Sequence, residues 1–193
     1  GHLGSLQACQ AVYGLVKETF GRCHVLVNCA GATKAGSFLD QPDEDWIDGF
    51  ATKFFGTVRL CRLLWPMLKE AQGHVVNIAG GAARTPDATF LVGGAVNAAM
   101  LNFTKGLSQL GKRDGVNVNA ILPGAVASPM LDGLAEELGV TPADIHRVFL
   151  HHQLFEEVLE PREITEALLW LVSDAARHIT GHCLAVDGGW LVK

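Results

Sequence analysis

His24-Val25-Leu26-Val27-Asn28, followed at once by Cys29-Ala30-Gly31, is the stretch that decides the fold. A short, unbroken apolar run of this kind is typical of a parallel strand that is covered on both faces. Similar runs occur at residues 74–78 (HVVNI), 116–122 (VNVNAIL) and 182–186 (HCLAV). We therefore predict four buried strands.

The segments between these strands carry helical patterns. Gly21 is placed to end the first helix, and Pro161 suits the first turn of the last one. Pro66 is expected to kink or end the long second helix, and residues 125–160 look mobile. We expect helices over residues 5–20, 43–70, 93–111 and 161–173. This alternation predicts a parallel, doubly wound α/β sheet of the Rossmann type, with residues 1–193 forming a single domain.

Length, composition and charge narrow the function classes. The 193 residues fit one domain, and the net charge of −5 without a basic patch argues against nucleic acid as a partner. No apolar run is long enough to span a membrane. The five cysteines are scattered and odd in number, which indicates reduced thiols and no structural metal. We expect a cytoplasmic protein that acts on a small molecule.

A ligand site is expected where the strands end. In doubly wound sheets, ligands bind outside the carboxyl ends of the strands. Here these ends are residues 28–31, 79–81 and 123–128 and the loop after Val186, and three of the four are rich in Gly and Ala. Small residues let the backbone approach a flat ligand closely, but they also make tight turns. Spacing alone leaves both interpretations open.

Four motifs in order along the chain resemble those of short-chain dehydrogenases/reductases. Residues 25–31 (VLVNCAG) are similar to the family's LVNNAG signature, and residues 123–130 (PGAVASPM) to its PGxVxTPM segment. Residues 180–190 (TGHCLAVDGGW) resemble its TGxxxxVDGGW ending, and residues 97–105 (NAAMLNFTK) resemble the helix that follows the catalytic tyrosine. The resemblance covers nearly the whole chain.

The family's opening strands and its TGxxxGxG loop have no counterpart in this sequence. The resemblance therefore implies a Rossmann-type domain without its first strands and its glycine-rich loop, and strand 24–28 is expected to present an open edge. It also implies NAD or NADP as the cofactor. The residue that would decide between the two is absent.

The resemblance places replacements at each catalytic position. Family members transfer hydride with a Tyr that acts as acid and base, a Lys that lowers the pKa of the Tyr, a Ser and an Asn. Aligned on these motifs, Gly93 stands at the Tyr position, Asn97 at the Lys position, Gly80 at the Ser position and Lys53 at the Asn position. The resemblance thus implies that Lys and Asn have exchanged places, which keeps one cation in the site. A solvated helix lysine is the alternative for Lys53, and Phe90 is expected to be an apolar wall.

The same motifs imply cofactor contacts from two loops. Asn28 is expected beside a ribose or as a hydrogen-bonding residue at the strand end, and Ser128 beside the nicotinamide or as a helix N-cap. The predicted cofactor-binding residues are Asn28, Ala30, Gly31, Pro123, Gly124, Val126 and Ser128.

Two functions remain open from the sequence. The first is an oxidoreductase that transfers hydride between NAD(P) and a carbonyl or alcohol through a non-standard relay containing Lys53 and Asn97. The second is a non-catalytic pseudoenzyme or oligomeric binding scaffold. Helices 43–70 and 93–111 are apolar over more than one face, as the family's subunit interfaces are, so a homodimer or homotetramer through them is expected.

Overall fold

A computed structural model describes the chain except for residues 1–2, 32, 130–132, 134, 137–138, 152 and 193. Its described part contains one parallel sheet in the order β1-β2-β3-β4. The strands are β1 (Val25–Asn28), β2 (His74–Ile78), β3 (Asn117–Pro123) and β4 (Cys183–Val186). Each pairs with the next in parallel, so the predicted topology is confirmed. Met130 and His152 of the expected loop region lie outside the described residues.

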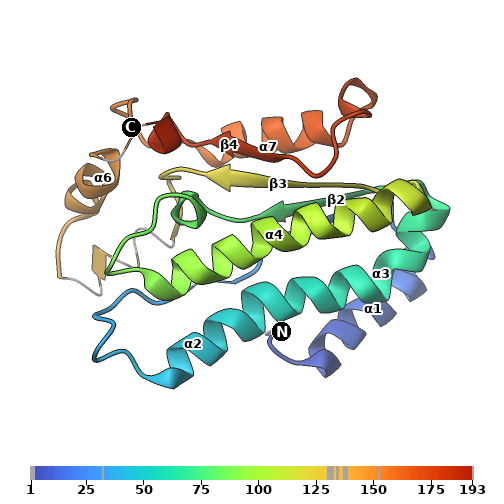
Figure 1. Cartoon of the computed structure of the whole chain (residues 1–193), viewed down its shortest axis with the longest axis horizontal. Coiled ribbons are helices and arrows are strands. Elements are labelled where there is room, and N and C mark those ends of the chain that lie inside the picture. Colours follow the sequence, from blue (N-terminus) through green and yellow to red (C-terminus); the bar gives the residue numbers. More distant parts are fainter. Residues whose placement is uncertain are drawn as a thin grey trace.

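Helices cover both faces of this sheet (Figure 1). One layer holds α1 (Leu6–Phe20), α3 (Gly56–Glu70) and α4 (Leu91–Asp114), and the opposite layer holds α7 (Pro161–Leu171). Fully buried side chains of β2 and β3 lie between the layers, among them Val75, Val118 and Ile121. The remaining described elements are α2 (Asp43–Gly49), a π-helical turn (Phe50–Phe55), α6 (Pro142–Leu150) and three single 3₁₀ turns (Gly81–Ala83, Asp174–Ala176, Trp190–Val192). No described helix is both long and apolar enough to cross a membrane.

Strand β1 is covered on one face only, which corrects the expectation of two covered faces. Leu26 and Asn28 are buried, whereas Val25 and Val27 are 39% and 40% exposed. The reason is that α7, the helix on the second face, packs on β3 and β4, which lie toward the opposite edge of the sheet from β1. The edge of β1 is thus open in the described structure, as expected.

The predicted helix 43–70 forms as three consecutive pieces rather than one regular helix. Between α2 and α3 lies the π-helical turn Phe50–Phe55. Pro66 lies inside α3 and does not end it, since the helix continues to Glu70. Proline removes one backbone donor, but Leu64 and Leu68 on either side are buried in the core and hold the turn in place.

Helix α4 extends beyond the predicted range 93–111 at both ends. Gly111 was expected to end it, but the helix runs to Asp114 and ends at Gly115, which has a φ of 77°. Gly111 is needed for a different reason, because a Cβ there would overlap the carbonyl oxygen of Val116. Gly111 in α4 and Val116, just before β3, lie so close together that only glycine fits at position 111.

The segment 125–160 holds more structure than the expected mobile loop. It contains α6 and a parallel bridge between Val126 and Leu159. Figure 1 shows α6 beyond the carboxyl ends of the strands, at the end of the molecule where the C-terminus lies. The segment therefore lies beside the expected ligand site.

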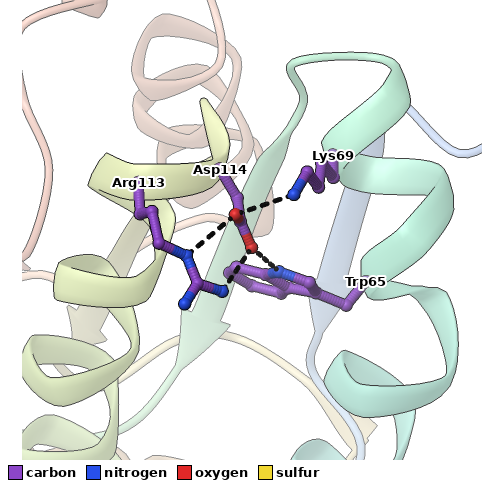
Figure 2. Close-up of polar contacts among 4 residues, drawn as sticks. All are labelled: Trp65, Lys69, Arg113 and Asp114. Carbon is purple, nitrogen blue, oxygen red and sulfur yellow. Dashed lines mark hydrogen bonds and ion pairs between the residues drawn. The ribbon is translucent and has the colours of Figure 1, made fainter.

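Asp114 joins α3 to α4 at the end of the molecule opposite that site (Figure 2). Its carboxylate accepts hydrogen bonds from Trp65 Nε1 (2.8 Å), Lys69 Nζ (3.0 Å) and Arg113 Nε (3.1 Å). Its side chain is only 3% exposed. The bonds from Arg113, Trp65 and Lys69 hold the pKa of this carboxyl well below its usual range.

We predict that Asp114→Asn lowers the thermal midpoint of unfolding by several degrees at pH 7. A depressed carboxyl pKa contributes stability that is present above the unfolded value of about 3.9 and is lost as the pH falls below it. The difference from the unsubstituted protein should therefore shrink at pH 3.5. Thermal unfolding at both pH values checks this, with exposed Asp40→Asn as the matched control. Equal midpoints for the two variants at pH 7 would contradict the prediction.

Candidate active site

The carboxyl ends of the strands bring the predicted site residues into one region. Parallel pairing aligns Asn28 of β1 with Asn77 of β2, and Pro123 of β3 with Val186 of β4. The loops that follow these strands therefore lie along one edge of the sheet, on the side where α6 lies (Figure 1). This arrangement is the one that doubly wound proteins use for ligands.

Lys53 reaches this edge from the π-helical turn. Its Nζ lies 3.4 Å from the carbonyl oxygen of Ala79, the first residue after β2. The loop after β1 lies directly on its backbone, because a Cβ on Gly31 would be 2.8 Å from Lys53 Cβ. Gly31 has a φ of 113°, which only glycine adopts readily. Single π-helical turns are frequent at functional sites, and here the turn sets the position of the lysine.

Burial lowers the pKa of Lys53 to about 8, and the nearby sulfur of Cys29 offsets part of this effect. The ammonium form still predominates at pH 7. Among the described residues Lys53 forms no salt bridge, and its ammonium donates a hydrogen bond to the carbonyl of Ala79. The surface-lysine alternative is therefore not the one the structure adopts.

Asn97 lies against the same short loop. It is 5% exposed, on α4, and its Oδ1 has no hydrogen-bond partner in the described structure. A Cβ on Gly80 would be 3.0 Å from Asn97 Nδ2. A serine at position 80 would thus crowd the amide. Glycine at position 80 therefore leaves room for the amide of Asn97. Lys53 contacts Ala79, the residue before Gly80.

Phe90 occupies the space that a side chain at position 93 would need. A Cβ on Gly93 would overlap the ring of Phe90, which precedes α4. The ring of Phe90 thus lies against position 93, and glycine at that position is what admits it. The replacements at positions 80 and 93 each have a neighbour that accounts for them.

Asn28 has a structural role that the sequence left open. Its Nδ2 donates to Asn77 Oδ1 (2.9 Å), and Asn77 Nδ2 donates to Thr104 Oγ1 (2.9 Å). This buried chain of bonds ties β1 to β2 and α4. Asn28 Oδ1 has no hydrogen-bond partner among the described residues, and Asn28 lines a small hollow together with Cys29, Ala30, Thr52 and Thr57. Asn28 thus anchors the strand at the edge of this hollow.

The loop after β3 is held against the end of β4. A Cβ on Gly124 would be 2.7 Å from the carbonyl oxygen of Asp187, so this position requires the smallest residue. Val126 is fixed by its bridge to Leu159, and Ser128 is partly buried two residues later. Asp187 accepts from the backbone N–H of Gly189 (2.9 Å) and of Leu191 (3.0 Å), and thereby orders the last turn.

Cys29 is the site residue that sequence reasoning missed. The five cysteines were expected only to be reduced thiols, but Cys29 is exposed, directly after β1, and its sulfur raises the pKa of Lys53. The only sequence signal was its place between Asn28 and Ala30 in the loop motif. Its position relative to Lys53 depends on the π-helical turn, which no sequence pattern predicted.

Comparison with known proteins agrees with this geometry. The family model described as enoyl-(acyl carrier protein) reductase matches residues 3–191. The chain belongs to the short-chain dehydrogenase/reductase family. L-Sorbose reductase of Gluconobacter frateurii, solved in complex with NADPH and L-sorbose, superimposes with a TM-score of 0.93 at 26% identity, over 100% of this chain and 76% of that one.

Curated short-chain dehydrogenase/reductase relatives are longer than this chain. The 2-keto-3-deoxy-L-fuconate dehydrogenase of Xanthomonas campestris pv. campestris is 30% identical over 88% of the chain, which spans 57% of that protein's length. The short-chain reductase protein NovJ of Streptomyces niveus is 32% identical over 95% of the chain and 70% of its own length. The chain thus spans only part of the length of these relatives.

Proposed function

We propose that the protein is an NAD(P)-dependent oxidoreductase that transfers hydride between the cofactor and a carbonyl or alcohol, with Lys53 and Asn97 in a rearranged relay. The observation that supports this is a partly buried ammonium and a buried amide oxygen that lacks a partner in the described structure, both at the loop Ala79-Gly80. Each is costly in a folded chain unless a ligand or water satisfies it.

The described residues fit the nicotinamide half of such a cofactor. Gly31 and Gly124 leave no room for a side chain, and Asn97 Oδ1 offers an unused acceptor. Pro123, Gly124, Val126 and Ser128 would hold the nicotinamide side, and Asn28, Ala30 and Gly31 the ribose. The cofactor, when bound, supplies or accepts the hydride. NADPH in the sorbose reductase complex makes NADP a reasonable first choice, and NAD stays open.

The chain's own residues would then hold and move the proton. Lys53 Nζ is a cation aimed at the Ala79 carbonyl, where it can stabilise negative charge on a substrate oxygen. Asn97 would position a water or a ribose hydroxyl. Since Gly80 and Gly93 bring no hydroxyl group, a bound water must carry the proton.

A scaffold without catalysis is the competing function, and the missing Ser and Tyr favour it. Against it stands the cost of Lys53. A buried charge without an ionised partner destabilises a fold, and a scaffold would be better served by an apolar side chain. In addition, Asn97 lies against Gly80 and the ring of Phe90 lies against Gly93, so each glycine makes room for a neighbouring side chain. Such compensation favours a site with altered residues over one that has simply lost them.

Titration of NADH and NADPH tests the proposal. The protein should carry any sequence that its gene encodes ahead of Gly1, and binding is read from quenching of its four tryptophans and from enhanced emission of the reduced cofactor. We expect saturable binding and, with a panel of aldehydes and ketones, oxidation of the cofactor. Lys53→Ala should retain binding and abolish turnover. No binding at millimolar cofactor would exclude the enzyme, and unchanged turnover in Lys53→Ala would remove Lys53 from the relay.

We further propose that the protein acts in the cytoplasm as a homodimer or homotetramer through residues 43–70 and 93–111. Much of the apolar surface of these helices is used inside the chain, since Leu60, Leu64 and Met100 are buried. Ile47 and Phe55 remain 65% and 47% exposed and would supply the contact. Light scattering at micromolar concentration checks the assembly, and a monomer would refute it.

A further inference from the structure

Cys29 differs from the other four cysteines, and the structure describes all five. Cys9, Cys61 and Cys183 are buried and Cys23 is partly buried, whereas Cys29 is exposed. Burial raises the pKa of each of the other four thiols, that of Cys61 to about 12. These four therefore stay protonated and unreactive near neutral pH. A thiol reagent should find one target in the folded protein.

The loop that carries this exposed thiol packs against Lys53, in the π-helical turn. The sulfur of Cys29 raises the pKa of Lys53, against the larger lowering by burial. The contact is close, because Gly31 packs against the Cα, Cβ and backbone N of Lys53. Reactive cysteines occur in such partly exposed surroundings next to a lysine, where the ammonium stabilises the sulfur anion.

A second feature indicates that a ligand can enter here. Cys29 lines the hollow that also contains Asn28, Ala30, Thr52 and Thr57. Asn28 is 6% exposed, and its Oδ1 has no hydrogen-bond partner in the described structure. Asn28 and Cys29 thus line the same hollow, and Ala30, one of the proposed ribose contacts, lines it too.

We propose that Cys29 is a thiol-modification site, assisted by Lys53, at which a small-molecule disulfide forms a mixed disulfide that blocks cofactor binding. The Cys29 sulfur gives up its proton and attacks one sulfur of the reagent. The reagent's S–S bond breaks, a new S–S bond to Cys29 forms, the other half leaves as a thiolate, and the proton from Cys29 passes to solvent. A second thiol reverses the reaction. The blocking step rests on the proposed function, whereas the modification does not.

The probe is 5,5′-dithiobis(2-nitrobenzoate), an anionic disulfide that releases a coloured thiolate. We expect one fast equivalent from the folded protein, located on Cys29 by mass spectrometry of its peptides. Cys29→Ser should remove the fast equivalent, and Cys23→Ser, the matched control, should retain it. Lys53→Met should slow the fast phase about tenfold, and Lys53→Arg should largely preserve its rate because it keeps the charge.

Two results would overturn the site itself: label on another cysteine, or an unchanged rate in Lys53→Met. Mapping the label on the unsubstituted protein makes the first result independent of whether any variant folds. For the blocking step, NADPH is titrated before labelling, after labelling and after reduction with dithiothreitol. We expect at least a tenfold loss of affinity that reduction restores. Unchanged affinity after full labelling would refute blocking and leave the proposed function standing. A protein that binds no cofactor in any state would refute the proposed function and, with it, blocking, and would leave the Cys29 site standing.

Discussion

Lys53→Met is expected to stabilise the folded protein at pH 7 while it abolishes turnover. The lysine pKa falls from 10.5 to about 8 on folding, because burial disfavours the ammonium form. One pKa unit corresponds to about 1.4 kcal/mol, so the charge costs the fold at most about 3.5 kcal/mol. Methionine fills a similar volume without a charge. A substitution that stabilises the fold but removes activity indicates that the original residue, here Lys53, is retained for activity.

The pH dependence of this gain has a definite sign. A lysine whose folded pKa lies below its unfolded pKa binds its proton less tightly in the folded state. Its penalty is therefore full below pH 8 and disappears as the pH rises from about 8 to 10.5. The advantage of Lys53→Met should be greatest at pH 7 and nearly gone at pH 10.5.

Urea unfolding of both proteins at pH 7, 9 and 10.5 measures this difference. Exposed Lys105→Met on α4 is the matched control and should leave stability within about 0.5 kcal/mol at each pH. A Lys53→Met variant that is less stable than the unsubstituted protein at pH 7 would show that the ammonium is held by favourable contacts. The case against a scaffold would then fail.

The sheet and its order could be predicted because buried parallel strands leave an unmistakable pattern. The run HVLVN at residues 24–28 and its three counterparts were each placed within one residue. Errors arose where one residue type serves two purposes. Gly111 was interpreted as a helix end, yet it is there for the close approach of Val116. Pro66 was interpreted as a break, yet packing of its neighbours overrides the lost hydrogen bond.

The sequence named candidate site residues but not their geometry. The resemblance to family motifs singled out Lys53 and Asn97, and in the structure both lie at Ala79-Gly80. Sequence could not show that the lysine lies in a π-helical turn, which shifts its direction relative to a regular helix. It also could not show that Cys29 shares a charge interaction with Lys53, since that contact joins two elements far apart in the chain.

Phe90→Tyr is expected to raise turnover about 100-fold, the lower end of what a well-placed acid or base contributes. The ring of Phe90 occupies the space beside Gly93, which is the position the family fills with its tyrosine. A hydroxyl on this ring would replace the water that we propose as proton carrier. Phe38→Tyr, the same change on an exposed ring outside the site, should leave turnover unchanged.

The new phenol can be observed without a substrate. The chain has a single tyrosine, Tyr13 in α1, so near-ultraviolet absorbance would report the added group against one background signal. If the cation of Lys53 acts on it, the phenol of Phe90→Tyr should ionise below its ordinary pKa of about 10. Combining Phe90→Tyr with Lys53→Met should remove both that shift and the gain in turnover. A phenol with an ordinary pKa and no gain in turnover would show that Phe90 only walls the pocket, because proton transfer and the pKa shift both require the ring to face the charged end of Lys53.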